Sequence, residues 1–112
     1  MKSLIGIDQF KKLDFRVGTI VEAESAKDVQ VPAIWLKIDF GPLGIKSSSA
    51  QLTDHYTPQD LMGRQIVGIV NIPPRQIGKY SSEVLVLGGF EEGGAVRLLN
   101  LDKPVENGAR LK

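Results

Sequence analysis

Residues 71–89 read Asn-Ile-Pro-Pro-Arg-Gln-Ile-Gly-Lys-Tyr-Ser-Ser-Glu-Val-Leu-Val-Leu-Gly-Gly. This stretch joins two runs, Gln65 to Ile72 and Val84 to Leu87, that are apolar at nearly every position. Such runs are typical of strands that are covered on both faces. Between them, a rigid Pro-Pro turn leads to Arg75 and Lys79, with no acid separating the two. The sequence therefore predicts two buried strands joined by a loop that holds basic groups in place for a ligand.

Alternating patterns earlier in the chain predict further strands. Apolar and polar residues alternate from Phe15 to Glu24, which places Val17 and Val21 on the buried face. The alternation returns from Ile34 to Phe40, and a Gly-Pro-Leu-Gly turn then leads into a third run, Ile45 to Ala50. The second and third strands should therefore form a hairpin.

Two short helices and a last strand complete the predicted elements. Asp8 can cap a helix over Gln9 to Leu13. Thr57 followed by Pro58 is typical of a helix start, with Thr57 as the cap. A sixth short strand is expected from Val96 to Leu99.

The order of these elements predicts an all-β fold, a small closed barrel. Short strands at regular spacing, with one helical interruption between the third and fourth strands, are typical of such barrels. The five-stranded OB-fold has its helix at that place, while an SH3-like barrel and a small sandwich are the alternatives. We expect an N-terminal helical extension over residues 1–13 and one barrel domain with a C-terminal extension over residues 14–112.

Apolar residues at both chain ends exceed what a minimal barrel can cover. An exposed apolar patch of that size is rare on monomers, so we expect a homodimer. The predicted interface residues are Ile7, Phe10, Leu98, Leu101 and Val105.

The composition limits the classes of function. The 112 residues suffice for one domain with a single core. The 14 basic and 13 acidic side chains give a net charge of +1, so no general field attracts nucleic acid. Cysteine is absent and His55 is the single histidine, so we expect no catalysis, no metal and no cofactor. No run is long enough to cross a bilayer and no secretion signal opens the chain, which favours a cytoplasmic protein.

Polar and basic residues around the loop form the predicted binding site. Its residues are Lys46, Ser48, Arg75, Lys79, Ser82 and Glu83. The planar fork of Arg75 suits phosphate or carboxylate, and Lys79 offers a point charge. Glu83 either caps backbone amides of the loop or supports Arg75 or Lys46. RNA would need aromatic platforms, which are scattered here, and we expect Trp35 to pack rather than to stack on a ligand.

Four blocks of the sequence resemble the CsaA proteins, small export-related chaperones built on the tRNA-binding OB-fold domain. The blocks are Val31–Gly41, Gly44–Leu52, Val70–Arg75 and Ser82–Gly89. The resemblance implies a homodimeric, cytoplasmic OB barrel that binds unfolded or precursor polypeptides and assists their export, in contact with the export machinery. The same domain occurs in methionyl and phenylalanyl tRNA synthetases and in free-standing tRNA-binding proteins, which implies tRNA as the alternative ligand.

Two departures from this wider group bear on the ligand. Where tRNA binders usually carry His-Pro-Asn-Ala-Asp-Lys-Leu, this chain has Val29–Trp35, and their Ser-Glu-Gly-Met is here Ser82–Leu85. The lost polar groups favour polypeptide over tRNA. The hypotheses are therefore a polypeptide-binding chaperone, which we favour, a tRNA-binding module, and a purely structural dimerisation or appendage domain.

Overall fold

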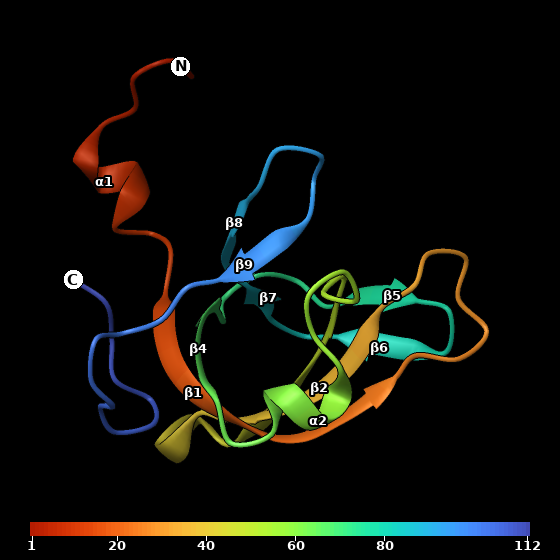
Figure 1. Cartoon of the computed structure of the whole chain (residues 1–112). Helices are drawn as coiled ribbons and strands as arrows, with labels where there is room; N and C mark the ends of the chain where they lie inside the picture. Colours follow the sequence, from red (N-terminus) through yellow and green to blue (C-terminus); the bar gives the residue numbers. More distant parts are fainter.

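The five main strands curve into a nearly closed barrel (Figure 1). A computed structural model describes all 112 residues, and its main sheet is antiparallel in the order β3-β2-β1-β4-β7. The strands are β1 (Phe15–Ser25), β2 (Ile34–Asp39), β3 (Ile45–Ala50), β4 (Gln65–Ile69) and β7 (Leu85–Val86). Helix α2 (Pro58–Leu61) follows β3 and precedes β4, as in an OB-fold. The predicted fold class is confirmed.

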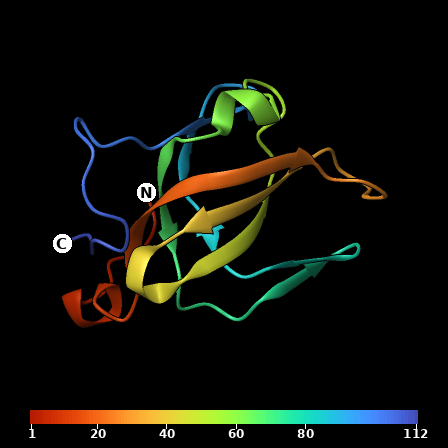
Figure 2. The ribbon, with the colours of Figure 1, turned by 90° about the horizontal axis from the view of Figure 1, so that it is seen from below.

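Two hairpins extend from the barrel. Strand β5 (Arg75–Ile77) pairs with β6 (Tyr80–Ser82), and β8 (Gly88–Phe90) pairs with β9 (Val96–Leu98). In Figure 2 the β5–β6 hairpin projects on the same side of the barrel as the loop between β1 and β2. The prediction of a plain loop after the Pro-Pro turn is therefore wrong, because the backbone of this segment pairs with itself.

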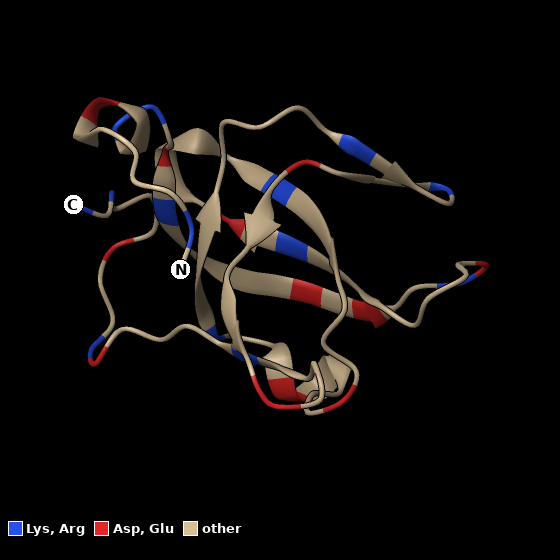
Figure 3. Ribbon diagram, turned by 90° about the horizontal axis from the view of Figure 1, so that it is seen from above, with Lys and Arg blue, Asp and Glu red and all other residues tan.

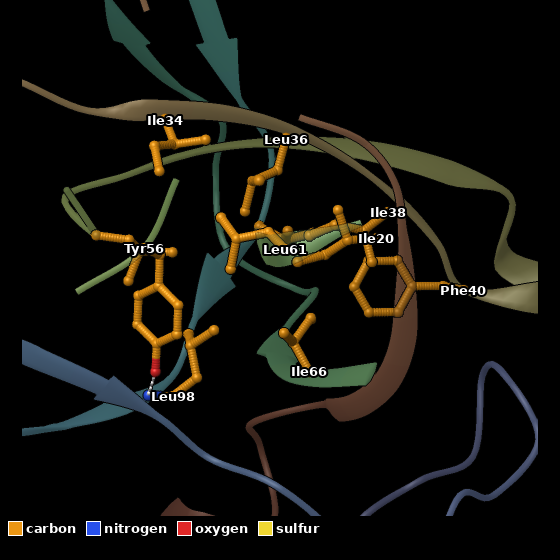
Figure 4. Packing of buried hydrophobic residues seen from close by; sticks show 11 residues of the cluster. Ile20, Ile34, Leu36, Ile38, Phe40, Tyr56, Leu61, Ile66 and Leu98 are labelled. Carbon is orange, nitrogen blue, oxygen red and sulfur yellow. Dashed lines mark hydrogen bonds between the residues drawn. The ribbon is translucent and has the colours of Figure 1, made fainter. Parts of the chain in front are cut away.

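The barrel interior is filled by aliphatic side chains and two aromatic rings (Figure 4). The cluster consists of Ile20, Ile34, Leu36, Ile38, Phe40, Leu52, Tyr56, Leu61, Ile66, Val84 and Leu98. Tyr56 connects the segment before α2 to β9, because its hydroxyl accepts a hydrogen bond from the Leu98 backbone N–H at 3.1 Å. Leu98 is only 9% exposed, so its prediction as a dimer-interface residue is wrong: the side chain belongs to the core.

In its first half, strand β1 turns into the barrel the face opposite to the one predicted. Ile20 and Gly18 point into the barrel, where a Cβ on Gly18 would lie 2.6 Å from the Ile38 Cγ2 atom. A register shift between Ile20 and Glu22 then reverses the alternation and leaves Val21 exposed. Val17 is buried outside the core cluster, under the C-terminal extension, where its N–H donates to the Ala109 carbonyl at 2.9 Å.

The two short α-helices differ in how they are held. Helix α2 has the predicted Thr57 cap: Thr57 Oγ1 accepts from Asp60 N at 3.3 Å, and the Asp60 carboxylate accepts from Thr57 N at 2.9 Å. The Thr57 amide, and then its hydroxyl, hold the pKa of Asp60 below its usual value. Helix α1 (Ile7–Phe10) begins after Gly6 without a side-chain cap, so the predicted Asp8-capped helix is wrong.

One further element is the 3-10 turn η1 (Gly41–Leu43), which joins β2 and β3 as the predicted hairpin connection. None of the helices has the length and apolar character needed to cross a membrane.

Candidate functional site

A groove runs beside the β5–β6 hairpin and is here called the hairpin groove. Two adjoining hollows of about 540 and 470 Å³ form it, and Val31, Ser49, Gln51 and Ile77 line both. One wall comes from β5 and the loop between β1 and β2, and the other from β7 and the β8–β9 hairpin. Half of the residues around the larger hollow are apolar. Most of the apolar lining thus comes from segments far apart in the sequence.

Arg75 is the only basic residue that lines the hairpin groove. Its Nη2 donates to Ser82 Oγ at 3.3 Å, and no carboxylate lies within ion-pairing distance. Ser82 Oγ also accepts from Ser49 N on β3 at 3.0 Å. Because Ser82 is fully buried, it does not meet a ligand directly. It instead positions Arg75 against the end of β3.

Glu83 joins β3 to the segment that precedes β7. Its Oε1 accepts from Ser47 N at 3.1 Å and from Ser47 Oγ at 2.8 Å. The predicted support of Arg75 or Lys46 is therefore wrong, because the carboxylate faces Ser47. Next to it, Ser48 Oγ donates to the Val84 carbonyl at 3.0 Å, and Ser48 is 1% exposed beneath the groove. These polar residues close the barrel wall rather than contact a ligand.

The two predicted lysines lie outside the hairpin groove. Lys46 lines a separate hollow of about 500 Å³ on the outer barrel face, beside Trp35 and Glu83. Lys79 sits at the tip of the β5–β6 hairpin, with Nζ 5.6 Å from the centre of the Tyr80 ring. The structure thus separates the basic residues that the sequence grouped into one site.

An aromatic contact fixes the β5–β6 hairpin on the barrel. The rings of Tyr80 and Trp35 lie 4.8 Å apart, centre to centre, and the Tyr80 hydroxyl accepts from Lys27 N at 2.9 Å. Trp35 therefore has the packing role predicted for it. This contact holds in place the wall of the hairpin groove to which β5 belongs.

The opposite wall carries the residue that the sequence reading missed. Phe90, at the end of β8, lines the groove and is 83% exposed. The glycines and acids around it are typical of a turn, so the sequence does not indicate a binding residue here. Its sequence signal is a lone large apolar residue in an otherwise polar and glycine-rich stretch.

Three polar side chains, Glu91, His55 and Arg97, anchor the β8–β9 hairpin. The Glu91 carboxylate lies 3.0 Å from His55 Nε2 and also accepts from the Arg97 guanidinium. The hydrogen bond from Arg97, and then that from His55, hold the pKa of Glu91 below its usual value, and the same bond raises the pKa of Arg97. His55 belongs to the segment between β3 and α2, so the cluster links this segment to the β8–β9 hairpin.

Most of the predicted interface residues lie on the surface of the single chain. Ile7 is 65% exposed, Phe10 40%, Leu101 38% and Val105 44%. The Phe10 ring packs on Phe15 with a centre-to-centre distance of 5.4 Å. The surface therefore offers apolar area at both ends of the chain, which leaves the dimer a prediction.

Solved structures match nearly the whole chain. The chaperone CsaA of Bacillus anthracis is 48% identical with a TM-score of 0.94, over 98% of this chain and 100% of that one. The CsaA chaperone protein of Picrophilus torridus is 43% identical with a TM-score of 0.91, over 97% and 100%. The resemblance to CsaA proteins seen in the sequence is confirmed.

Curated relatives point to a second kind of protein. The methionine–tRNA ligase of Porphyromonas gingivalis is 32% identical over 108 residues, and that of Methanothrix thermoacetophila is 37% identical over 111 residues. These matches cover 96% and 99% of this chain but 16% of each ligase, so the chain spans about one sixth of their length.

One family model covers most of the chain. It is described as "Putative tRNA binding domain" and matches residues 15–110, from the start of β1 into the C-terminal extension. The chain therefore belongs to the tRNA binding domain family.

Proposed function

We propose that this chain is a non-catalytic chaperone that binds unfolded or precursor polypeptides in the hairpin groove. The observation that carries the proposal is the composition of this groove: an apolar lining with one arginine that lacks an acidic partner. Extended polypeptides bind through apolar side-chain pockets with a few placed polar groups. Arg75 supplies such a group for a client carbonyl or carboxylate.

Exposed apolar side chains supply the affinity. Phe90 is 83% exposed, Val31 53% and Leu85 37%, and all three line the groove. Burying a side chain of this size against a client contributes about 1.5–3 kcal/mol. Several such contacts hold an unfolded segment reversibly, as a chaperone must.

The same groove is poorly suited to RNA. Sites for single-stranded RNA combine a basic track with aromatic platforms. The hairpin groove has one arginine, two acids, Asp28 and Asp54, and one exposed aromatic ring, Phe90. A phosphate backbone would therefore find too little positive charge there. The 48% identity to a protein described as a chaperone supports the same choice.

A second candidate function is tRNA binding. It is favoured by the matched family and by the methionine–tRNA ligases among the relatives. These relatives are less similar than the CsaA structures, yet they share the whole barrel.

The assembly and setting of the chaperone are part of the proposal. A homodimer would cover the exposed apolar residues Ile7, Phe10, Leu101 and Val105. We extend the proposal to a cytoplasmic chaperone that holds clients for the export machinery, with residues 1–13 as an extension that serves the dimer.

The experiment compares two matched apolar truncations in an aggregation assay. Phe90→Ala removes a groove side chain, and Leu99→Ala removes an exposed side chain that does not line the groove. We expect the wild type and Leu99→Ala to suppress aggregation of a chemically unfolded client. Phe90→Ala should bind a fluorescent apolar peptide roughly 10-fold more weakly, which corresponds to about 1.4 kcal/mol.

A charge pair tests the polar contact in the same assay. Arg75→Glu should weaken binding of a peptide that carries an acidic residue, while Lys79→Glu, with the same change in charge outside the groove, should not. Failure of the wild type both to suppress aggregation and to bind the peptide would overturn the proposal.

A further inference from the structure

A hollow on the outer barrel face combines a tryptophan with two carboxylates, and is here called the Trp35 hollow. Its volume is about 390 Å³, and its lining consists of Glu22, Ala23, Glu24, Trp35, Lys37 and Met62. In Figure 3, red and blue segments lie side by side on neighbouring strands of this face. The hollow shares no residue with the hairpin groove or with the predicted dimer interface, so it is a separate surface.

The pairing of β1 with β2 places the acids beside the tryptophan. Glu24 pairs with Trp35, and Glu22 pairs with Lys37. Side chains of directly paired residues lie on the same face, with Cβ atoms about 4.5–5.5 Å apart. Ala23, between the two acids, packs against the core, so both carboxylates are on the outer face.

Glu24 carries the uncompensated charge of the Trp35 hollow. Lys37 is the only basic residue in the lining, and its Nζ lies 3.7 Å from the Glu22 carboxylate. Glu24 is exposed and belongs to no ion pair. The hollow therefore has a net negative charge beside an aromatic ring.

The adjoining hollow on the same face has no such excess. Its two lysines, Lys37 and Lys46, are matched by Glu22 and Glu83. Glu83 is in addition held by hydrogen bonds from β3. A cation on the outer barrel face therefore finds its free carboxylate at Glu24.

Fixed backbone holds the aromatic and apolar parts of the Trp35 hollow. Tyr80 packs against the Trp35 ring at 4.8 Å, centre to centre, and Trp35 is half-buried, so the ring is held in place while part of it stays open. Met62 is 50% exposed, and the Gly63 N–H next to it donates to the Ile20 carbonyl on β1 at 2.9 Å. The hollow thus offers a ligand a preformed surface.

We propose that the Trp35 hollow binds the guanidinium group of an arginine side chain on a partner polypeptide. A guanidinium is planar, so it stacks on an aromatic ring and donates to a carboxylate at the same time. Trp35 supplies the ring and Glu24 the carboxylate, while the negative charge of the hollow disfavours an anion. The site goes beyond the proposed function, because it does not require a client in the hairpin groove.

The test uses a peptide of glycine, serine and arginine, which has no apolar side chain for the hairpin groove. Trp35 is the single tryptophan of the chain, so its fluorescence reports binding at this hollow. We expect a saturable change with the arginine peptide and none with a matched citrulline peptide, which keeps the shape of the side chain without its charge. Arginine amide that binds as tightly as the peptide would overturn the choice of a polypeptide in favour of a small cation.

Two matched charge removals locate the site. Glu24→Gln keeps the size of the side chain in the hollow, and Glu92→Gln makes the same change at an exposed position that lines no hollow. Loss of an exposed ion pair should weaken binding of the arginine peptide roughly 2- to 5-fold in Glu24→Gln, with little change in Glu92→Gln. Equal affinity in the wild type and Glu24→Gln, or equal loss in both variants, would overturn the inference.

Two more measurements separate the remaining outcomes. Anisotropy of a labelled arginine peptide that shows binding without any change in Trp35 emission would place the peptide elsewhere and overturn the inference. Self-association of the wild type that light scattering finds weakened in Glu24→Gln alone would assign the hollow to a second copy instead. Glu24→Gln should keep wild-type affinity for the fluorescent apolar peptide, so a failure of the chaperone proposal and a failure of this site are distinguishable.

Discussion

Removing one hydroxyl group, in Tyr56→Phe, tests how the core holds the β8–β9 hairpin. The Tyr56 hydroxyl accepts a hydrogen bond from the Leu98 N–H at 3.1 Å, and both residues are 9% exposed (Figure 4). The phenylalanine ring fills the same space but offers no acceptor. The Leu98 N–H is then left buried without a partner.

The expected loss in the free energy of unfolding follows from the burial of the Leu98 N–H. A buried donor that loses its partner destabilises a protein by about 1–3 kcal/mol. For a domain of roughly this size, each kcal/mol lowers the melting temperature by about 4–8 °C. Because Leu98 lies on β9, the loss also loosens a wall of the hairpin groove.

Tyr80→Phe is the matched control. The Tyr80 hydroxyl also accepts a backbone N–H, from Lys27 at 2.9 Å, but Lys27 lies in an exposed loop where water can replace the hydroxyl. We expect Tyr80→Phe to cost less than about 1 kcal/mol. Urea denaturation measures both free energies, and hydrogen exchange should show faster exchange at the Leu98 amide in Tyr56→Phe alone. Equal costs for the two variants would refute the reasoning.

Four further substitutions test other parts of the structure. Gly18→Ala adds a Cβ 2.6 Å from a core side-chain atom, so urea denaturation should show a loss of about 1–3 kcal/mol. Gly89→Ala meets nothing within 4 Å and should be near neutral. Thr57→Ala removes a helix cap and should cost about 0.5–2 kcal/mol in the same assay. The pKa of Glu91 is lowered on folding, so its stabilisation is complete above the unfolded value of about 4.3 and is lost as pH falls through the folded value. The stability gap between wild type and Glu91→Gln should therefore narrow as pH falls below the unfolded value, and a constant gap would contradict the ionised pairing.

Local chemistry made part of the fold predictable. The Thr57–Pro58 pair with Asp60 specifies the start of α2 through bonds within one turn, and the capping box is present. The run Ile45 to Ala50 is β3 with the predicted bounds, because a Gly-Pro-Leu-Gly turn sets its start. Elements whose limits are set by neighbouring residues can be read from sequence.

Long-range contacts decided the parts that sequence reading missed. The β5–β6 hairpin has strands of three residues each, too short for a pattern, and it is fixed by the contact between Tyr80 and Trp35. The buried face of β1 depends on a bulge near Val21 and on the close approach of Gly18 to β2. Neither effect leaves a periodic signal.

Of the residues that line the hairpin groove, the sequence indicates Arg75 but not the apolar ones. Arg75 was identified because a basic residue follows a rigid Pro-Pro turn. Phe90 and Val31 reach the same groove from distant segments, so only the folded chain brings them together. Conversely, Ser48 and Ser82 occur in polar runs yet are buried. Their hydroxyls form hydrogen bonds with backbone groups, the Val84 carbonyl and the Ser49 N–H.

Helix α1 has little support from the rest of the single chain. It has four residues, none of them buried, and no side-chain cap. Helices shorter than about 12 residues are marginal in water without packing, and here the Phe10 ring of the helix packs on Phe15 of β1. Ile5 and Ile7 are also exposed. Their apolar surface stays in contact with water in a single chain, which is unfavourable. We expect a second chain to cover these isoleucines while the adjoining lysines stay exposed, because like charges on two copies repel each other.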